Sequence, residues 1–151
     1  MKDTVILDLD GTLADVSYCR RHIVRSHPEF PGKRDFDRFH EEALLAPVIE
    51  EIVEMAHLFS KDCWVIIVTA RKEMRRKDTE GWLKRHDIPW DYLFMRGDSD
   101  HRAPEDVKRD ILNEIRNKGF NPVVAVDDSP KIIEMFKEEG LRTILVPGWM
   151  D

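Results

Sequence analysis

Short apolar runs alternate with longer segments of helical period along the whole chain, and this alternation limits the possible folds more than any other feature. The runs are rich in β-branched residues and do not alternate between apolar and polar positions; they cover residues 5–9, 64–68, 92–95, 123–126 and 142–146. Strands of this kind are typical of a parallel sheet whose two faces are both covered by crossover helices. We therefore expect an α/β fold with a central parallel sheet of five strands, in one domain that spans residues 1–151.

The segments between these runs carry the start and stop signals of helices. Three of them combine a proline near the start with an apolar stripe of helical period, and two of the three end at a glycine. The prolines are Pro47, Pro104 and Pro130, and the glycines are Gly119 and Gly140. These signals predict three amphipathic helices between the strands.

Two further stretches give weaker signals. A helix is expected over residues 79–86, although Gly81 weakens its helical propensity. Residues 15–45 are predicted to be mostly helical, with a break at residues 28–33. We expect them to form only a small helical insertion beside the site, which leaves it open to the end of a polymer.

The composition excludes several classes of protein. The 24 basic and 30 acidic side chains give a net charge of −6, which argues against a general nucleic-acid coating protein. Two cysteines are too few for a disulfide framework or a four-cysteine zinc site and favour a reducing, cytoplasmic compartment. No apolar run approaches the ~20 residues of a membrane span, and acidic residues interrupt the N-terminal region where a signal peptide would be apolar. We expect no membrane association.

Polar and charged side chains follow the predicted strands at their carboxyl ends, where open parallel sheets bind ligands. Those that we expect to meet there are Asp8, Asp10, Thr69, Lys108, Asp127 and Asp128. Carboxylates this close repel one another unless they are protonated or bridged by a cation, and Mg²⁺ suits a site made of oxygen ligands. The pattern therefore predicts a magnesium-dependent site.

A phosphoryl group fits such a site, because the cation screens its charge from an attacking carboxylate. Asp8 and Asp10 stand at i and i+2, so both can address one ligand before Gly11 lets the chain turn. Lys108 and the Thr69 hydroxyl could hold the phosphoryl oxygens. Asp10 would act as general acid toward the leaving alcohol and then as general base for water.

The segment Asp8-Leu9-Asp10-Gly11-Thr12-Leu13-Ala14 resembles the first motif of the haloacid dehalogenase superfamily of phosphatases. Three later motifs of that superfamily are matched in order by Thr69, by Lys108 and by the pair Asp127-Asp128. The resemblance covers nearly the whole chain and implies a three-layer, Rossmann-like fold with a minimal helical cap.

The resemblance also implies roles for individual residues. Asp8 would be the nucleophile, and Asp10 the acid and base. Asp8, the backbone carbonyl of Asp10 and Asp127 would hold Mg²⁺, with Asp128 as a further ligand or as a neighbour of the ligands. The catalytic set is thus Asp8, Asp10, Thr69 and Lys108.

Within the superfamily, the chain most resembles the 3′-phosphatase domain of phage polynucleotide kinase-phosphatase. That domain has an arginine two residues after the hydroxyl of its second motif, as Arg71 stands here, and a tryptophan in the next helix, as Trp82 does. It also has an arginine six residues before the lysine of its third motif, the place of Arg102. The resemblance implies removal of 3′-phosphates from polynucleotide ends in DNA or RNA repair.

The match to that domain has two gaps. The family carries an acid four residues before the third-motif lysine, where this sequence has Pro104, so that role passes to Glu105, to Asp106 or to no residue. An essential arginine after the first motif corresponds to Arg20 or Arg21, in a register that is off by at least one residue. These gaps affect the substrate more than the chemistry.

Several residues are candidates for binding the substrate: Thr12, Arg20, Arg21, Ala70, Arg71 and Arg102. Residues 71–77 hold five basic side chains and one acid, which could continue into a groove for a phosphate backbone. A solvated helix face is the competing interpretation of this stretch. Further basic residues of the groove would be Arg25, Lys33 and Arg34. Trp90 and Trp149 could stack on bases, although packing in the core or near the terminus explains both better.

Three functions remain open. The first is a phosphatase of nucleic-acid 3′ ends, and the second a phosphatase of free nucleotides or small phosphate esters. The third is a phosphoacceptor receiver domain, in which the acidic pair follows the first strand rather than a late one. The chain has no Gly-x-x-x-x-Gly-Lys loop, so a kinase or ligase partner would be a separate polypeptide.

Overall fold

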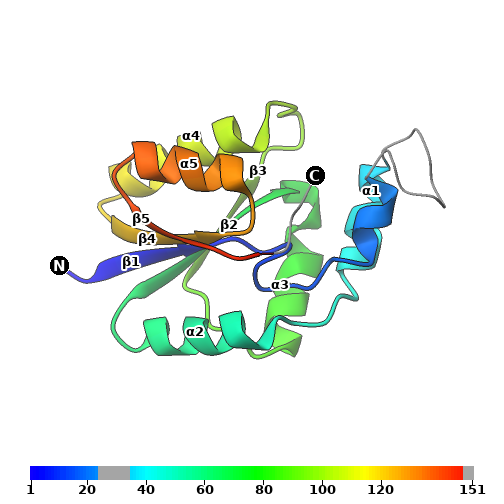
Figure 1. Ribbon diagram of the computed structural model, residues 1–151, viewed down its shortest axis with the longest axis horizontal. Coiled ribbons are helices and arrows are strands. Elements are labelled where there is room, and N and C mark those ends of the chain that lie inside the picture. The colour runs from blue at the N-terminus through cyan, green and yellow to red at the C-terminus, as the bar shows by residue number, and fades with distance from the viewer. Residues whose placement is uncertain (24–34, 148–151) are drawn as a thin grey trace.

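The computed structural model describes residues 1–23 and 35–147 (Figure 1). Five strands pair in parallel in the order β3-β2-β1-β4-β5. The strands are β1 (Asp3–Leu7), β2 (Trp64–Lys72), β3 (Tyr92–Arg96), β4 (Asn121–Asp127) and β5 (Arg142–Leu145). The predicted α/β fold with a parallel sheet of five strands is therefore confirmed, and β1 lies at its centre.

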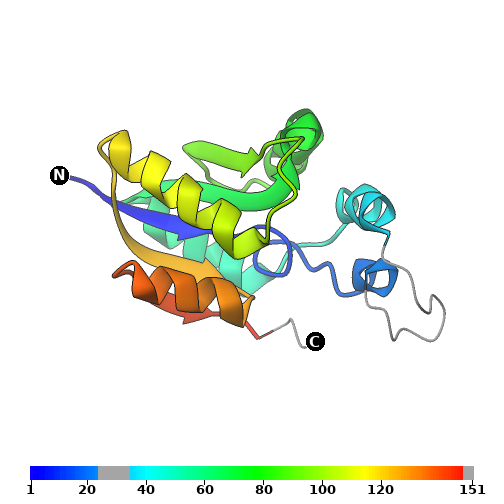
Figure 2. The ribbon, with the colours of Figure 1, turned by 90° about the horizontal axis from the view of Figure 1, so that it is seen from above.

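Helices cover both faces of the sheet, as the crossover connections require. The helices are α1 (Phe36–Ala43), α2 (Glu50–Ser60), α3 (Arg76–Arg85), α4 (Pro104–Asn117) and α5 (Pro130–Glu138), and the 3-10 turns are η1 (Cys19–His22) and η2 (Glu73–Arg75). α4 and α5 pack on one face, and α2 and α3 on the other (Figure 1). Figure 2 shows α1 and η1 apart from these layers, beyond the edge at which the strands end.

The core consists of two apolar clusters on the two faces of the sheet. Val5 and Leu7 of β1 belong to the cluster that also contains Trp82 of α3, while Ile6 belongs to the cluster with Phe136 of α5. Alternate residues of one strand are therefore buried on opposite faces. This explains why the strand sequences lack an alternation of apolar and polar residues.

The boundaries of several elements differ from the prediction. β1 covers Asp3–Leu7 rather than residues 5–9, because the backbone of Leu9 already accepts the hydrogen bonds of a tight loop. β2 continues to Lys72, four residues past its predicted end. α3 begins at Arg76 instead of residue 79 and contains the exposed Gly81 in its interior.

The prediction that Pro47 starts a helix is wrong, since α2 begins at Glu50. The backbone around Pro47 is instead paired with the loop after β1. The Asp15 amide donates to the Pro47 carbonyl at 2.8 Å, and the Ile49 amide donates to the Leu13 carbonyl at 2.8 Å. This pairing ties the start of α2 to the loop that carries the first acidic motif.

Residues 15–45 form two short helical elements where they are described. They contain the four-residue turn η1 and the eight-residue helix α1, which Asp35 caps by accepting from the Arg38 amide at 3.0 Å. The break predicted at residues 28–33 lies outside the described residues. We call the described part of residues 15–45 the cap. No helix in the described ranges has the length and apolarity needed to cross a bilayer.

Candidate active site

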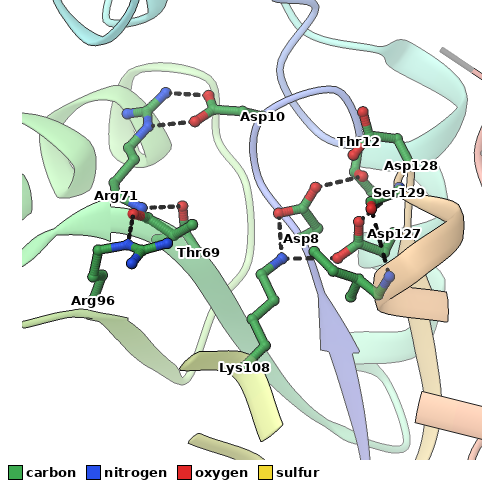
Figure 3. Close-up of polar contacts among 12 residues, drawn as sticks. Asp8, Asp10, Thr12, Thr69, Arg71, Arg96, Lys108, Asp127, Asp128 and Ser129 are labelled. Carbon is green, nitrogen blue, oxygen red and sulfur yellow. Dashed lines mark hydrogen bonds and ion pairs between the residues drawn. The ribbon is translucent and has the colours of Figure 1, made fainter. Parts of the chain in front are cut away.

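Three carboxylates meet at the carboxyl end of the sheet. Asp8 directly follows β1, Asp127 ends β4, and Asp128 is the next residue. The backbone aligns the two strands there, because the Asp8 amide donates to the Val126 carbonyl at 3.0 Å. One oxygen from each carboxylate lies within 4.8 Å of the others, and all three side chains are buried (Figure 3).

Lys108 of α4 reaches into this group of carboxylates and is itself only 1% exposed. Its Nζ donates to Asp8 Oδ1 and to Asp127 Oδ2, each at 2.8 Å. Burial alone would lower the pKa of Lys108, but the two carboxylates outweigh it and raise the pKa above its usual value. The lysine is therefore a fixed positive charge between two buried acids.

Two cationic side chains face these three carboxylates, Lys108 beside Asp8 and Asp127 and Arg20 beside Asp128, so the charges do not balance. Burial and the charge of Asp127 raise the pKa of Asp8 well above its usual value, in spite of the opposing effect of Lys108. Burial raises the pKa of Asp128 to about 6, with Asp127 adding to the effect. A further cation would relieve this repulsion, and carboxylate oxygens are the donors that Mg²⁺ prefers. The donor set therefore fits a magnesium ion.

Neighbouring groups fix the orientation of these carboxylates. The Thr12 hydroxyl donates to Asp8 Oδ2 at 3.0 Å, so both oxygens of Asp8 are held, one by Thr12 and one by Lys108. The Ser129 amide donates to Asp127 Oδ1 at 3.0 Å. Thr12 is fully buried and does not line the cavity, so the structure places it behind the nucleophile rather than against a substrate.

Asp10 lies apart from the three carboxylates and pairs with Arg71 (Figure 3). Arg71 Nε donates to Asp10 Oδ2 at 2.9 Å, and Nη2 donates to Oδ1 at 2.6 Å. Burial would raise the pKa of Asp10, but the charge and hydrogen bonds of Arg71 lower it below its usual value. Arg71 is 1% exposed and also donates to the Thr79 hydroxyl. It holds the acid/base candidate in place instead of being free for a substrate.

Gly11 allows the loop after β1 to pass close to Asp128. Its φ of +86° lies in the left-handed region, and a Cβ at this position would overlap the Asp128 carboxylate and the Arg20 guanidinium. Arg20 Nη2 donates to Asp128 Oδ2 at 2.7 Å. The glycine is thus required both by its backbone conformation and by the close packing of this ion pair.

A cavity of about 980 Å³ lies above these residues, between the sheet edge and the cap. Asp8, Asp10, Thr69, Lys108, Asp127 and Asp128, the predicted catalytic and metal-binding residues, all line it. The predicted substrate-binding residues that also line it are Arg20, Ala70, Arg71 and Arg102. The Ala70 carbonyl is occupied, since it accepts from Arg96 Nε at 3.1 Å.

The other two predicted arginines are also held by acids, as Arg20 and Arg71 are. Arg21 forms an ion pair with Glu42 within the cap and does not line the cavity, so the structure does not bring it to the site. Arg102 lies at the rim, half exposed, and binds Asp100 and Asp110. Of the two acids considered as replacements at Pro104, Glu105 lines the cavity and Asp106 does not.

The basic stretch 71–77 is only partly directed at the cavity. Lys72 and Arg75 line it together with Arg71, whereas Arg76 pairs with Glu73 and Glu80 on the surface. Trp90 packs against the apolar core and does not line the cavity, so the structure does not bring this stacking candidate to the site. Trp82, the tryptophan of the family resemblance, is buried with its Nε1 donating to the Ala46 carbonyl. Arg25, Lys33, Arg34 and Trp149 lie outside the described residues.

Several residues that line the cavity were missed from the sequence, and two of them are polar side chains close to the predicted site, Arg96 and His40. Arg96 ends β3 and donates to the carbonyls of Ala70, Asp100 and Arg102, and the rule that strand ends build the site could have identified it. His40 comes from α1, and burial lowers its pKa to about 4. The sequence placed residues 15–45 beside the site, but no pattern within them indicated which side chains face it, so this histidine carried no signal.

The sequence matches a family model at residues 2–147, that of the polynucleotide kinase PNKP phosphatase domain. No curated protein matches the chain. Among solved structures, that of a Pnkp1/Rnl/Hen1 complex contains a chain that is 21% identical, with a TM-score of 0.78 over 97% of this chain and 46% of the other. A Pnkp1/Rnl/Hen1 RNA repair complex gives 0.75 at 21% identity, over 97% and 42%.

A smaller protein shows the same fold over most of its length. A haloacid dehalogenase-like hydrolase from Streptococcus pneumoniae is 14% identical, with a TM-score of 0.66 over 95% of this chain and 84% of the other. By contrast, the chain spans less than half the length of the two chains from the Pnkp1 complexes. These identities are low, so the likenesses to solved structures establish the fold alone.

Proposed function

The chain belongs to the PNKP phosphatase domain family and is a phosphatase domain of haloacid dehalogenase type, and we propose that it removes 3′-phosphates from polynucleotide ends. One observation carries the proposal: the buried Asp8 carboxylate is held by Lys108 and Thr12 beside two further acids, at the base of a large cavity with basic side chains in its wall. A carboxylate oriented in this way can act as a nucleophile toward phosphorus.

In the first step, an oxygen of Asp8 attacks the phosphorus of the substrate. The ester bond from phosphorus to the 3′ oxygen breaks, and the leaving oxygen takes a proton from Asp10. The products are an aspartyl phosphate on Asp8 and a free 3′-hydroxyl group. Lys108 lies 2.8 Å from Asp8 and offers a positive charge where the phosphoryl oxygens gather.

In the second step, Asp10 removes a proton from a water molecule that attacks the same phosphorus. The bond from phosphorus to Asp8 breaks, inorganic phosphate leaves, and Asp10 is protonated again. The paired Arg71 favours the ionised form of Asp10, which is the form that this second step needs. The first step needs the protonated form, so Arg71 sets the balance between the two.

Asp8, Asp127 and Asp128, together with the backbone carbonyl of Asp10, would hold Mg²⁺. When bound, the ion neutralises the charge that otherwise separates an anionic phosphoryl group from an anionic nucleophile. Lys108 already neutralises part of this charge through its contacts with Asp8 and Asp127. The chain therefore supplies both the ligands and a permanent countercharge.

The substrate class is supported by the form and charge of the cavity. A volume of about 980 Å³ exceeds the needs of a phosphate alone, and Lys72, Arg75 and Lys131 line it as well as Arg20. Several basic side chains in one cavity wall suit a sugar-phosphate chain. One of the similar chains comes from a Pnkp1/Rnl/Hen1 RNA repair complex, which supports repair partners on other polypeptides here.

A substrate panel tests the proposal. We expect Mg²⁺-dependent release of phosphate from 3′-phosphorylated DNA or RNA oligonucleotides, with kcat/KM higher than for 5′-phosphorylated oligonucleotides and 3′-mononucleotides of the same base. Asp8→Asn is the matched inactive control, since it keeps the side-chain volume. Equal or better hydrolysis of free nucleotides would support the alternative of a small-ester phosphatase. A stable phosphoprotein without turnover would support the receiver-domain alternative.

A further inference from the structure

We propose that the inner face of α1, with Met74 of η2 beside it, is a nucleoside subsite in which Phe36 stacks on the base next to the scissile phosphate and His40 hydrogen-bonds to the same nucleoside. The inference rests on the proposed function and deepens it. It assigns to the cap the recognition of the leaving group, whereas the sheet edge handles the phosphate.

His40 places this subsite on the leaving-group side of the reaction. It lines the same cavity as Asp10 and Arg71 and lies close enough to both for their charges to act on its imidazole. Asp10 is the group that gives its proton to the leaving oxygen, so that oxygen must come to Asp10. The nucleoside attached to the oxygen therefore lies next to His40.

The imidazole has one nitrogen that the fold leaves unused. His40 Nδ1 is buried and has no hydrogen-bond partner among the described residues. An unpaired buried polar atom costs free energy, and in a binding site its natural partner is a group of the ligand. The low pKa of His40 keeps the ring neutral at pH 7, which suits a sugar hydroxyl or a base edge better than an anion.

Two apolar side chains at the same cavity are left exposed to solvent. Phe36 of α1 is 51% exposed and Met74 of η2 is 69% exposed, and both line the cavity. Phe36 belongs to the cap, and Met74 belongs to the turn that follows β2. The two side chains therefore line the cavity from the cap and from the sheet. An aromatic ring and a polarisable thioether make favourable contacts with the face of any base.

The surrounding charge agrees with this assignment. Lys72 and Arg75 line the cavity next to Met74 in the sequence, and the Arg75 guanidinium lies 3.7 Å from Asp37 of the cap. Phosphates on either side of a stacked base would lie against the side chains of Lys72 and Arg75. The subsite thus combines a stacking face, an unused hydrogen-bonding atom and neighbouring cations, which are the parts that bind a nucleotide without reading its sequence.

A pair of oligonucleotides tests the stacking step. Both carry a 3′-phosphate, and one of them has an abasic sugar as its last unit. Phe36→Ala should raise KM for the ordinary end by roughly 5- to 100-fold, the loss expected for one stacked base, and leave the abasic end unchanged. Phe36→Trp should restore KM, because it restores an aromatic face.

The control variant is Tyr18→Ala, which removes an exposed ring from the same cap. Tyr18 is 71% exposed and does not line the cavity, so KM should stay unchanged for both ends. If Phe36→Ala raises KM equally for the ordinary and the abasic oligonucleotide, or changes KM for neither, the stacking assignment is wrong. Activity of the wild-type protein on the abasic end still supports the phosphatase proposal in that case, so the two failures can be told apart.

The hydrogen bond is tested with His40→Asn and His40→Phe. Asn keeps a polar atom near the place of Nδ1 and should retain most of the affinity, whereas Phe keeps the ring and should weaken binding roughly 2- to 10-fold. Binding is measured by fluorescence anisotropy of the oligonucleotide in an Asp8→Asn background, which removes turnover from the readout. Where His40→Phe fails to fold, His40→Ala replaces it. Equal binding by the polar and apolar variants would overturn this role.

Discussion

Removing the ammonium group of Lys108 should destabilise the protein strongly when no divalent cation is present. We consider Lys108→Met, which keeps the unbranched stem of a side chain that is 1% exposed. The variant loses two hydrogen-bonded ion pairs of 2.8 Å, to Asp8 and to Asp127, and leaves both carboxylates buried without their countercharge. The site then holds three acids, because Asp128 lies beside them.

Removing one partner from a buried ion pair costs about 3–5 kcal/mol of unfolding free energy. For a domain of this size, each kcal/mol corresponds to roughly 2–4 °C, so the melting temperature should fall by roughly 6–20 °C. Burial raises the pKa of Asp8, so protonation of Asp8 relieves part of the unpaired charge, and the loss of unfolding free energy should be smaller at pH 5 than at pH 8. Added Mg²⁺ should raise the stability of the variant more than that of the wild type, because the ion replaces the missing charge.

The assay is urea and thermal unfolding in EDTA and in Mg²⁺. The matched control is Lys118→Met, which removes an exposed lysine 3.9 Å from Glu114 and should cost less than about 1 kcal/mol. A loss for Lys108→Met no larger than for this control would refute the reasoning. So would an equal gain from Mg²⁺ in wild type and variant, since the ion would then not bind where the lysine charge acts.

Four other substitutions probe the chemistry and its pH dependence. Asp8→Asn and Asp10→Asn should each abolish turnover and leave the circular dichroism spectrum unchanged, because both keep the side-chain volume; hydrolysis by purified Asp8→Asn would falsify its assignment as nucleophile. Arg71 lowers the pKa of Asp10, so Arg71→Gln should move the acidic limb of the pH profile of kcat to higher pH. If the limb does not move, Arg71 does not act on the acid/base step. The pKa of His40 falls from 6.5 to about 4 on folding, so its contribution to stability is complete above pH 6.5 and is lost as the pH falls toward 4. The shift in pKa corresponds to roughly 3 kcal/mol of unfolding free energy. Urea unfolding of wild type and His40→Asn at pH 7 and pH 4.5 should show a smaller decrease of the unfolding free energy in the variant. Equal decreases in the two proteins would contradict this role of His40.

The parts of the fold that follow from local rules could be predicted from the sequence. Strand runs buried on both faces indicated the parallel sheet, and the rule that ligands bind beyond strand ends brought Asp8, Asp127 and Lys108 together. Pro104 and Pro130 marked the starts of α4 and α5. The helix starts depend on residues that are neighbours in the sequence. The site depends on one sheet edge, and the residues at that edge are those that follow each strand in the sequence.

Features that depend on distant partners could not be predicted. Pro47 has the local signature of a helix start, but its carbonyl accepts from the Asp15 amide, and this pairing delays the helix to Glu50. Arg71 looked available for a substrate because nothing local shows that Asp10 binds it on two atoms. The position of His40 depends on how α1 folds over the sheet edge, which no periodicity in residues 15–45 specifies.

The absence of a side chain at residue 11 has a consequence for reading related sequences. A methyl group there would displace the Asp128 carboxylate and the Arg20 guanidinium without altering the number of charged groups in the protein. Gly11→Ala would therefore disturb the acidic site through the added volume and the strained backbone conformation together. In a homologue that still carries every acid of the motifs, a larger residue at this place would predict a displaced acidic pair that a comparison of charged residues alone would not reveal.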